Sequence, residues 1–250
     1  MHKPKWPDDK LDWESFKGKF HSSWHEKMKP FIESEECFNI YQELKNSREV
    51  ILPASPDVWS AFYLTPYSGI KAIFVGMCPY HTIEGNKPVA DGLAFSCGNT
   101  RELSPSLITL YDVMEDDLNK KVVREPNLEY LALQGVLLLN TSLTVKHRKA
   151  DSHKELWEPF VKYLFMNILD TITGVPIILF GDTAKKQVEK YLFPMSQPYL
   201  KVTHPAYFSR TGELMIHNNL FTWCNKILMG NNKEVIYWDY NEFSEKWSPF

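Results

Sequence analysis

The hydrophobic residues of this chain gather in four short runs, each ending at a polar residue or a glycine. The runs extend over Lys71 to Gly76, Gly135 to Asn140, Val175 to Gly181 and Tyr199 to His204. Continuous apolar runs of this length are typical of strands buried on both faces, the pattern of a parallel sheet. We therefore expect four parallel strands at the centre of the fold.

Between the runs, apolar residues recur at helical spacing, most clearly from Trp157 to Ile172. Further helices are expected at about Ser106 to Leu118, Thr183 to Leu192 and His217 to Leu228. Ser104 and Pro105 form a cap and first-turn pair for the first of these. Alternating strands and helices predict an α/β fold with a four-stranded parallel sheet flanked by helices on both faces.

The N-terminal part, at about residues 10–65, is expected to be helical, with segments from Ser15 to Ile32 and from Glu36 to Leu44. The sequence contains no repeat, no low-complexity tract and no composition shift that marks a domain boundary. We therefore expect a single domain over residues 1–250.

Charge and cysteine content narrow the class of protein only slightly. The net charge is -3, so any contact with nucleic acid must come from local basic patches. The four cysteines, at positions 37, 78, 97 and 224, show neither a C-x-x-C pair nor zinc-type spacing. We expect no metal, no cofactor and an intracellular, reducing compartment, with nucleus and cytoplasm not distinguished.

No apolar run approaches the ~20 residues that a membrane span needs, and the N-terminus lacks a basic region followed by an apolar stretch. Membrane is therefore not expected as a partner.

The ligand-binding and catalytic residues should lie directly after the four strands, because ligands of open α/β sheets bind beyond the carboxyl ends of the strands. Five segments rich in polar and aromatic residues lie there: GMCPYH from Gly76, GLAFS from Gly92, NTSLTV from Asn140, Gly181-Asp182, and HPAYFS from His204.

These five segments, in this order, resemble the family 1 uracil-DNA glycosylases, whose patterns read GQDPYH, GLAFS, LLLN-x-x-LTV, a glycine-serine turn and HPSPLS. The resemblance covers about residues 10 to 240, and Ser152-His153 and Ile236 to Trp238 are also similar to the family. It implies a base-flipping DNA repair enzyme that hydrolyses the N-glycosidic bond of uracil in DNA and leaves an abasic site. It implies DNA as the partner of a monomeric chain, with a DNA-mimicking inhibitor or a replication protein as further partners.

The resemblance also implies roles for residues of the pocket. Phe95 would stack on the extruded base, and Tyr80 would crowd the pyrimidine C5 and exclude the methyl group of thymine. Asn140 would accept a hydrogen bond from N3 and donate one to O4, which cytosine cannot match. His204 would donate a hydrogen bond to O2 of the departing base, as an oxyanion hole does. Met77 replaces a glutamine on the base-binding side.

By the same resemblance, a second group of residues would contact DNA. Phe208 occupies the position of a leucine wedge that holds the base out of the stack. Ser104, Pro105 and Ser106 match a loop that presses on the DNA backbone, and Ser209 lies beside the wedge. Asp182 replaces a phosphate-contacting serine. The candidate cations for phosphate contact are Lys146, His147, Arg148, Lys149, Lys185, Lys186 and Arg210.

The largest departure from the family pattern is Cys78, which replaces the aspartate that orients the attacking water. A neutral thiol supplies no negative charge and is a poor base when buried. A general base contributes about 10² to 10⁴ in rate, so the substitution predicts a slow enzyme. Asp91 and Glu84, on a segment from Thr82 to Asp91 that is longer than in the family, are candidate replacements, with Asp91 placed among the catalytic residues.

Two other functions stay open at this point. The chain would be a catalytically weak or inactive DNA-binding relative with a role in replication, or a glycosylase for a C5-modified pyrimidine. The longer loop and the flexible Met77 favour the second of these, and the retained Tyr80 opposes it.

Overall fold

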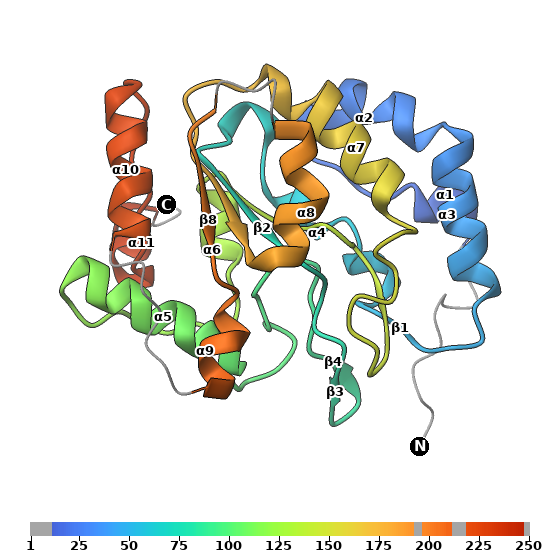
Figure 1. Cartoon of the computed structure of the whole chain (residues 1–250), viewed down its shortest axis with the longest axis horizontal. Helices are drawn as coiled ribbons and strands as arrows, with labels where there is room; N and C mark the ends of the chain where they lie inside the picture. The colour runs from blue at the N-terminus through green and yellow to red at the C-terminus, as the bar shows by residue number, and fades with distance from the viewer. Residues whose placement is uncertain (1–11, 193–196, 212–218, 248–250) are drawn as a thin grey trace.

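The computed structural model describes residues 12–192, 197–211 and 219–247, and its centre is a four-stranded parallel sheet. The strands are β2 (Ala72–Gly76), β5 (Val136–Asn140), β7 (Ile177–Phe180) and β8 (Tyr199–Val202), in the order β5-β2-β7-β8 (Figure 1). All four apolar runs are thus confirmed as strands.

One expectation about these strands needs correction. Every residue of β2, β5 and β7 is buried, but β8 alternates between exposed and covered positions. Tyr199 is 39% exposed. β8 pairs with β7 alone at one edge of the sheet, and its faces are covered less completely than those of β5, which forms the other edge and is fully buried.

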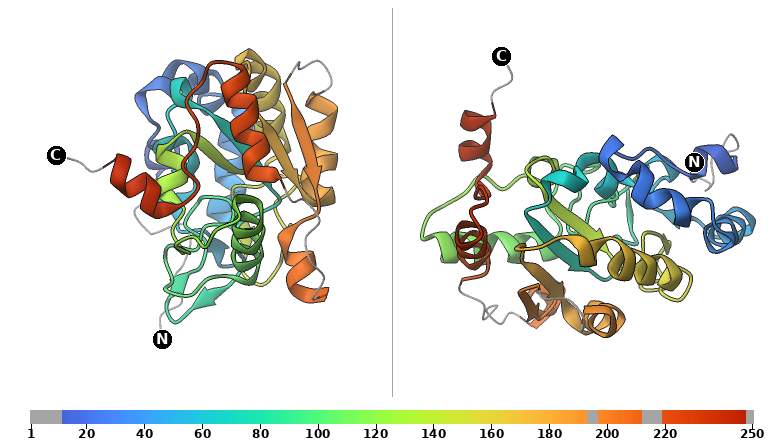
Figure 2. Two further views of the ribbon diagram at one scale, coloured as in Figure 1. Left: turned by 90° about the vertical axis from the view of Figure 1, so that its left-hand side faces the viewer. Right: turned by 90° about the horizontal axis from the view of Figure 1, so that it is seen from above.

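Helices cover both faces of the sheet, as the alternation predicts (Figures 1 and 2). On one side lie α7 (Glu158–Asn167), followed by the short turn η4 (Leu169–Thr171), and α8 (Gly181–Leu192). On the other lie α10 (Leu220–Gly230) and α11 (Tyr240–Lys246). Phe74 of β2 reaches this second layer, with ring centroids 6.3 Å from Phe221 and 5.8 Å from Trp238.

Three helix boundaries differ from the sequence-based expectation. Helix α8 begins at Gly181, so Asp182 lies in its first turn. Helix α7 ends at Asn167, before the expected Ile172. The start of the expected helix at His217 lies outside the described residues, and α10 begins at Leu220.

The N-terminal part is helical, as expected, but interrupted. Its elements are α1 (Trp13–Phe16), η1 (Ser22–Trp24), α2 (His25–Ile32), α3 (Glu35–Asn46), β1 (Ile51–Leu52), η2 (Ser55–Asp57), α4 (Ser60–Leu64) and η3 (Tyr67–Gly69). The single helix expected from Ser15 to Ile32 is wrong, because the chain leaves α1 at Lys17 and turns at Gly18.

The remaining elements surround the carboxyl ends of the strands. The segment from Thr82 to Asp91 forms a hairpin of β3 (Ile83–Glu84) and β4 (Lys87–Pro88), which projects on the same side as α9 (Pro205–Thr211) (Figure 1). The others are α5 (Pro105–Leu118), α6 (Glu129–Leu133) and β6 (Val145–Lys146), which pairs with β1. Ser104 caps α5 as expected, accepting a hydrogen bond from Leu107 N at 3.2 Å.

Over the described ranges, none of the helices has both the length and the apolar character that a membrane crossing demands.

Candidate active site

The loops that follow β2 and β5 are joined to each other at the sheet edge. The two strands pair up to Gly76 opposite Asn140. Beyond them, Thr141 N donates to Gly76 O at 3.0 Å, and Ser142 N donates to Met77 O at 3.1 Å. The Thr141 hydroxyl donates to the same Met77 carbonyl at 2.9 Å. These bonds fix the backbone conformation at Met77, which Cys78 directly follows.

Asn140 and Phe95 share a confined space beside Gly76. A Cβ atom at Gly76 would lie 2.6 Å from Asn140 Oδ1 and 3.7 Å from Phe95 Cζ, so a side chain here would displace the Asn140 amide. Asn140 is 6% exposed. The loop carrying Phe95 is attached to β5 through Ala94 N, which donates to Leu138 O at 3.0 Å.

The Phe95 ring also lies against His204. Asn140 and His204, the two polar side chains predicted to bind the base, therefore lie around one aromatic ring. The ring centroids of Phe95 and His204 are 5.7 Å apart, and Phe180 meets Phe95 edge-on at 4.7 Å. Phe95 has φ +67, a strained value for a bulky residue that its packing must maintain. The structure therefore brings Asn140, Phe95 and His204 together from three separate segments.

His204 is held neutral and in one tautomer. Burial lowers its pKa to about 4, and the nearby Arg210 acts in the same direction. Ala206 N donates to Nδ1 at 3.1 Å, so Nδ1 is the acceptor and Nε2 carries the proton. At neutral pH the side chain can therefore donate from Nε2 without carrying a charge itself.

Tyr80 is fixed by hydrogen bonds at its hydroxyl. The hydroxyl donates to Phe95 O at 3.0 Å and lies 2.5 Å from Ser104 Oγ. Burial raises the pKa of Tyr80, which keeps the phenol protonated. A ring anchored at its far end in this way is a rigid wall.

Cys78 is not an effective base in this position. Burial raises the pKa of its thiol to about 11, so the group is neutral at pH 7. Of the two acids considered as replacements, Glu84 is exposed on the β3–β4 hairpin.

Asp91 is engaged within its own loop. Its carboxylate accepts hydrogen bonds from Leu93 N at 3.1 Å, from the Ser96 hydroxyl at 2.5 Å and from Gly98 N at 2.8 Å. Burial raises its pKa, and these three donors oppose that rise. The contacts describe a carboxylate that shapes the loop carrying Phe95.

The residues expected to contact DNA lie around the same end of the sheet, with differing exposure. Pro105 and Arg210 are exposed, while Ser106 is 6% exposed. Asp182 forms an ion pair with Lys185, with Lys185 Nζ 3.2 Å from Asp182 Oδ1. The Ser209 hydroxyl donates to Ala206 O at 3.1 Å, within α9.

Helix α9 presents a different aromatic ring from the one expected. Phe208 is 9% exposed and belongs to the core, whereas the adjacent Tyr207 is 42% exposed. The two rings meet edge-on at 5.3 Å. This could not be predicted from the sequence, because neighbouring helical residues point in different directions and the start of α9 sets which one faces the core.

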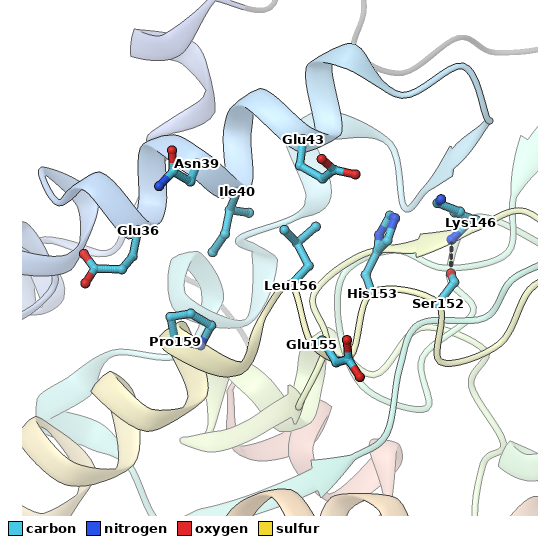
Figure 3. A pocket seen from close by; sticks show the side chains of 10 residues that line it. All are labelled: Glu36, Asn39, Ile40, Glu43, Lys146, Ser152, His153, Glu155, Leu156 and Pro159. Atoms are coloured by element: carbon cyan, nitrogen blue, oxygen red, sulfur yellow. Dashed lines mark hydrogen bonds between the residues drawn. The ribbon is translucent and has the colours of Figure 1, made fainter.

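A separate surface hollow of about 520 Å³ lies between α3 and the loop from Lys146 to Pro159. Glu36, Glu43 and Glu155 give it an acidic lining, and the Lys146–Ser152 hydrogen bond borders it (Figure 3). In the part of the chain that is described, no three His, Cys, Asp or Glu side chains cluster as metal ligands would.

The fold and site define a member of the uracil-DNA glycosylase superfamily. The model of that family matches residues 62–228, and the chain belongs to it. Among relatives, it is 34% identical to the "Uracil-DNA glycosylase" of Campylobacter fetus, over 91% of this chain and 97% of the relative. It is 31% identical to that of Fusobacterium nucleatum, over 88% and 96% respectively.

Solved structures show the same fold. The mimivirus uracil-DNA glycosylase superposes with a TM-score of 0.80 at 20% identity, covering 96% of this chain and 95% of the other. A Y322L variant of the mimivirus protein, solved in complex with UGI, gives 0.81 at 21% identity, with 96% of both chains covered.

Proposed function

We infer that this protein is a DNA glycosylase that hydrolyses the N-glycosidic bond of deoxyuridine in DNA, releasing uracil and leaving an abasic site. One observation carries this inference: Asn140, which ends β5, and His204, which follows β8, converge on the ring of Phe95 at the carboxyl edge of the sheet. The family and the names of its relatives agree with it.

The base is recognised by shape and by hydrogen bonds. Uracil stacks on Phe95, with N3 donating to Asn140 Oδ1 and the amide N–H of Asn140 donating to O4. Since Asn140 is almost fully buried, a base with the opposite pattern leaves buried polar groups without partners. Met77, directly after Gly76, would line the same pocket, and its carbonyl is held by the Thr141 hydroxyl.

Bond cleavage depends on stabilising the leaving base. As the bond between C1′ of the sugar and N1 of uracil breaks, negative charge develops on the base and positive charge on the sugar. The Nε2–H of His204 donates to O2 of the departing base, and its neutral state avoids the cost of burying an unpaired cation.

We propose that residues around the strand ends contact the DNA backbone. We also propose that the protein acts as a monomer. Ser104, Pro105 and Ser209 lie on the two helices that border the pocket, and Arg210 adds positive charge beside His204. At the start of α8, Asp182 and Lys185 largely neutralise each other. A DNA-mimicking inhibitor and a replication protein are further partners that this DNA-binding surface would accept.

A gel assay on a uracil-containing oligonucleotide, with chelator present, tests the proposal. Alkali-cleavable abasic sites should appear in the uracil strand and not in a matched thymine strand. The absence of abasic sites at stoichiometric protein would overturn the proposed activity. It would favour the second candidate, a DNA-binding relative that releases no base, which is consistent with the neutral thiol of Cys78. Release of a C5-modified pyrimidine in preference to uracil would instead identify a modified-base glycosylase.

Replacing Tyr80 with alanine should admit thymine. The anchored ring is the wall that meets a C5 methyl group, and a pocket discriminates such a methyl by roughly 10- to 200-fold. We expect the preference for uracil over thymine to fall by about that factor in competition assays. The exposed Tyr63 provides the matched control, Tyr63→Ala, which should keep the preference. A folded Tyr80→Ala protein that still releases uracil and no thymine would contradict the assignment.

Substitutions at the two aromatic residues of α9 should have different effects, one on the stability of the fold and the other on base extrusion. Phe208→Ala should lower the free energy of unfolding by about 3–5 kcal/mol, since it empties a buried site. Tyr207→Ala should change it by less than about 0.5 kcal/mol. It should, however, slow uracil release from duplex DNA by about 10-fold or more, since the ring that fills the vacated stack is lost.

Urea unfolding and excision from double- and single-stranded substrates measure both effects. The loss in Tyr207→Ala should be smaller on single strands, which have no opposing stack. If Phe208→Ala alone slows duplex excision while leaving stability intact, the wedge is Phe208, as the sequence predicts.

A further inference from the structure

The proposed hydrolysis lacks an obvious negatively charged group. Water must lose a proton as it attacks, and the cationic sugar needs a nearby anion. Cys78 is neutral, Glu84 is exposed on the hairpin, and both oxygens of Asp91 accept hydrogen bonds from their own loop.

The loop after β6 folds back onto the Cys78 segment. Arg148 N donates to His81 O at 2.8 Å, which joins this loop to the residues that follow Cys78. Lys146 N donates to the Ser152 hydroxyl at 2.8 Å, and Lys154 N donates to Asp151 O at 3.2 Å. His153 closes the loop from inside, with Nδ1 2.9 Å from the Thr144 hydroxyl. The loop thus has a defined shape around Asp151.

Asp151 lies close enough to Cys78 to act on its thiol. The backbone N–H of Asp151 lowers the pKa of the thiol, and the carboxylate raises it. Cys78 lies two residues beyond Gly76, the residue packed against Asn140 and Phe95. Asp151 therefore lies beside the segment that leads out of the base pocket, although 73 positions separate it from Cys78 along the chain.

The Asp151 carboxylate is an available acceptor. Its Oδ1 is buried and has no hydrogen-bond partner among the described residues. Its φ is +60, in the left-handed region, a conformation that the loop contacts maintain. Burial raises its pKa, while Lys154 acts in the opposite direction. Asp151 as a residue is only partly buried, but a buried carboxylate oxygen without a protein partner is unusual unless a ligand or water uses it.

We propose that Asp151 is the water-activating carboxylate of this enzyme, supplied from a loop remote in sequence to the side of the neutral Cys78. The proposal rests on the proposed function. In the step, a water oxygen bonds to C1′ while Asp151 takes the proton that this water loses. The C1′–N1 bond breaks, and its electron pair leaves with uracil, whose O2 faces Nε2–H of His204. Asp151 then returns its proton to solvent, and the uracil anion takes one up.

Asp151→Asn is the first test, because asparagine has nearly the same shape and tolerates a positive φ. Single-turnover release of uracil should fall by about 10²-fold or more. Asp170→Asn, at an exposed aspartate of η4, is the matched control and should keep the full rate. Asp151→Gly, which also tolerates this φ, provides a second variant if the first fails to fold. Thermal melting and affinity for an abasic-site duplex report folding and DNA binding.

Adding Cys78→Asp to the Asp151→Asn protein is the second test. If the two positions serve the same water, the new carboxylate should restore the rate at least 10-fold over Asp151→Asn alone. A folded Asp151→Asn protein within threefold of the unmodified rate would overturn the proposal, as would a failure of Cys78→Asp to restore activity. An unmodified chain that releases no uracil would instead overturn the proposed function itself.

Discussion

Asn140→Asp is expected to lower uracil release by on the order of 10⁴-fold, the largest effect among the substitutions considered. The amide donates to O4 and accepts from N3, whereas a carboxylate only accepts and repels O4. Because Asn140 is 6% exposed, solvent cannot compensate for the mismatch. The measurement is single-turnover excision from a uracil duplex, with affinity for an abasic-site duplex expected to stay unchanged.

The matched control is Asn119→Asp, at an exposed residue that ends α5 in a left-handed conformation which aspartate tolerates equally well. It should excise at the unmodified rate. A loss of less than 10-fold in Asn140→Asp would show that the amide does not read the base.

His204→Ala is expected to lower the excision rate by roughly 10²- to 10³-fold, the usual effect of removing one donor to a developing anion. Binding of the abasic-site duplex should change little, because the donor acts mainly on the departing base. His25→Ala, at an exposed histidine of α2, should have no such effect.

The same residue gives a signal that is independent of turnover. A histidine with its pKa lowered to about 4 stays neutral while pH falls from 8 to 5 and gains its proton only near pH 4. The NMR resonance of the His204 ring, assigned by its absence in His204→Ala, should follow that course. A midpoint near the ordinary value of about 6.5 would mean that burial does not lower the pKa of this ring, and that it is protonated below about pH 6.

The central sheet was predictable from the sequence because burial on both faces leaves an uninterrupted apolar run, and all four runs became strands. The edge position of β8 was not predictable from the sequence, since strand order depends on contacts between distant segments. The hairpin at Ile83–Glu84 and Lys87–Pro88 was also missed, because strands of two residues carry no periodicity.

The grouping of Asn140 with Phe95 and His204 was predictable because Asn140 ends β5 and parallel strands end at one edge. The positions proposed for Asp151 and Tyr207 were not predictable, for a different reason. Nothing near Asp151 in the sequence indicates that its loop returns to Cys78, and the contact exists only after β6 pairs with β1. Tyr207 depends on the rotation of a short helix, which one residue of shift would reverse.

The single hydroxyl of Tyr80 touches both the carbonyl of Phe95 and the cap of α5 at Ser104. If these residues have the roles proposed above, the residue that stacks on the base, the residue that excludes the methyl group and the helix start that contacts the sugar-phosphate chain form one hydrogen-bonded unit. A displacement of Ser104 by bound DNA would then shift the Tyr80 ring as well. On that proposal a free nucleoside, which makes no contact at Ser104, would be selected less stringently than the same base within DNA.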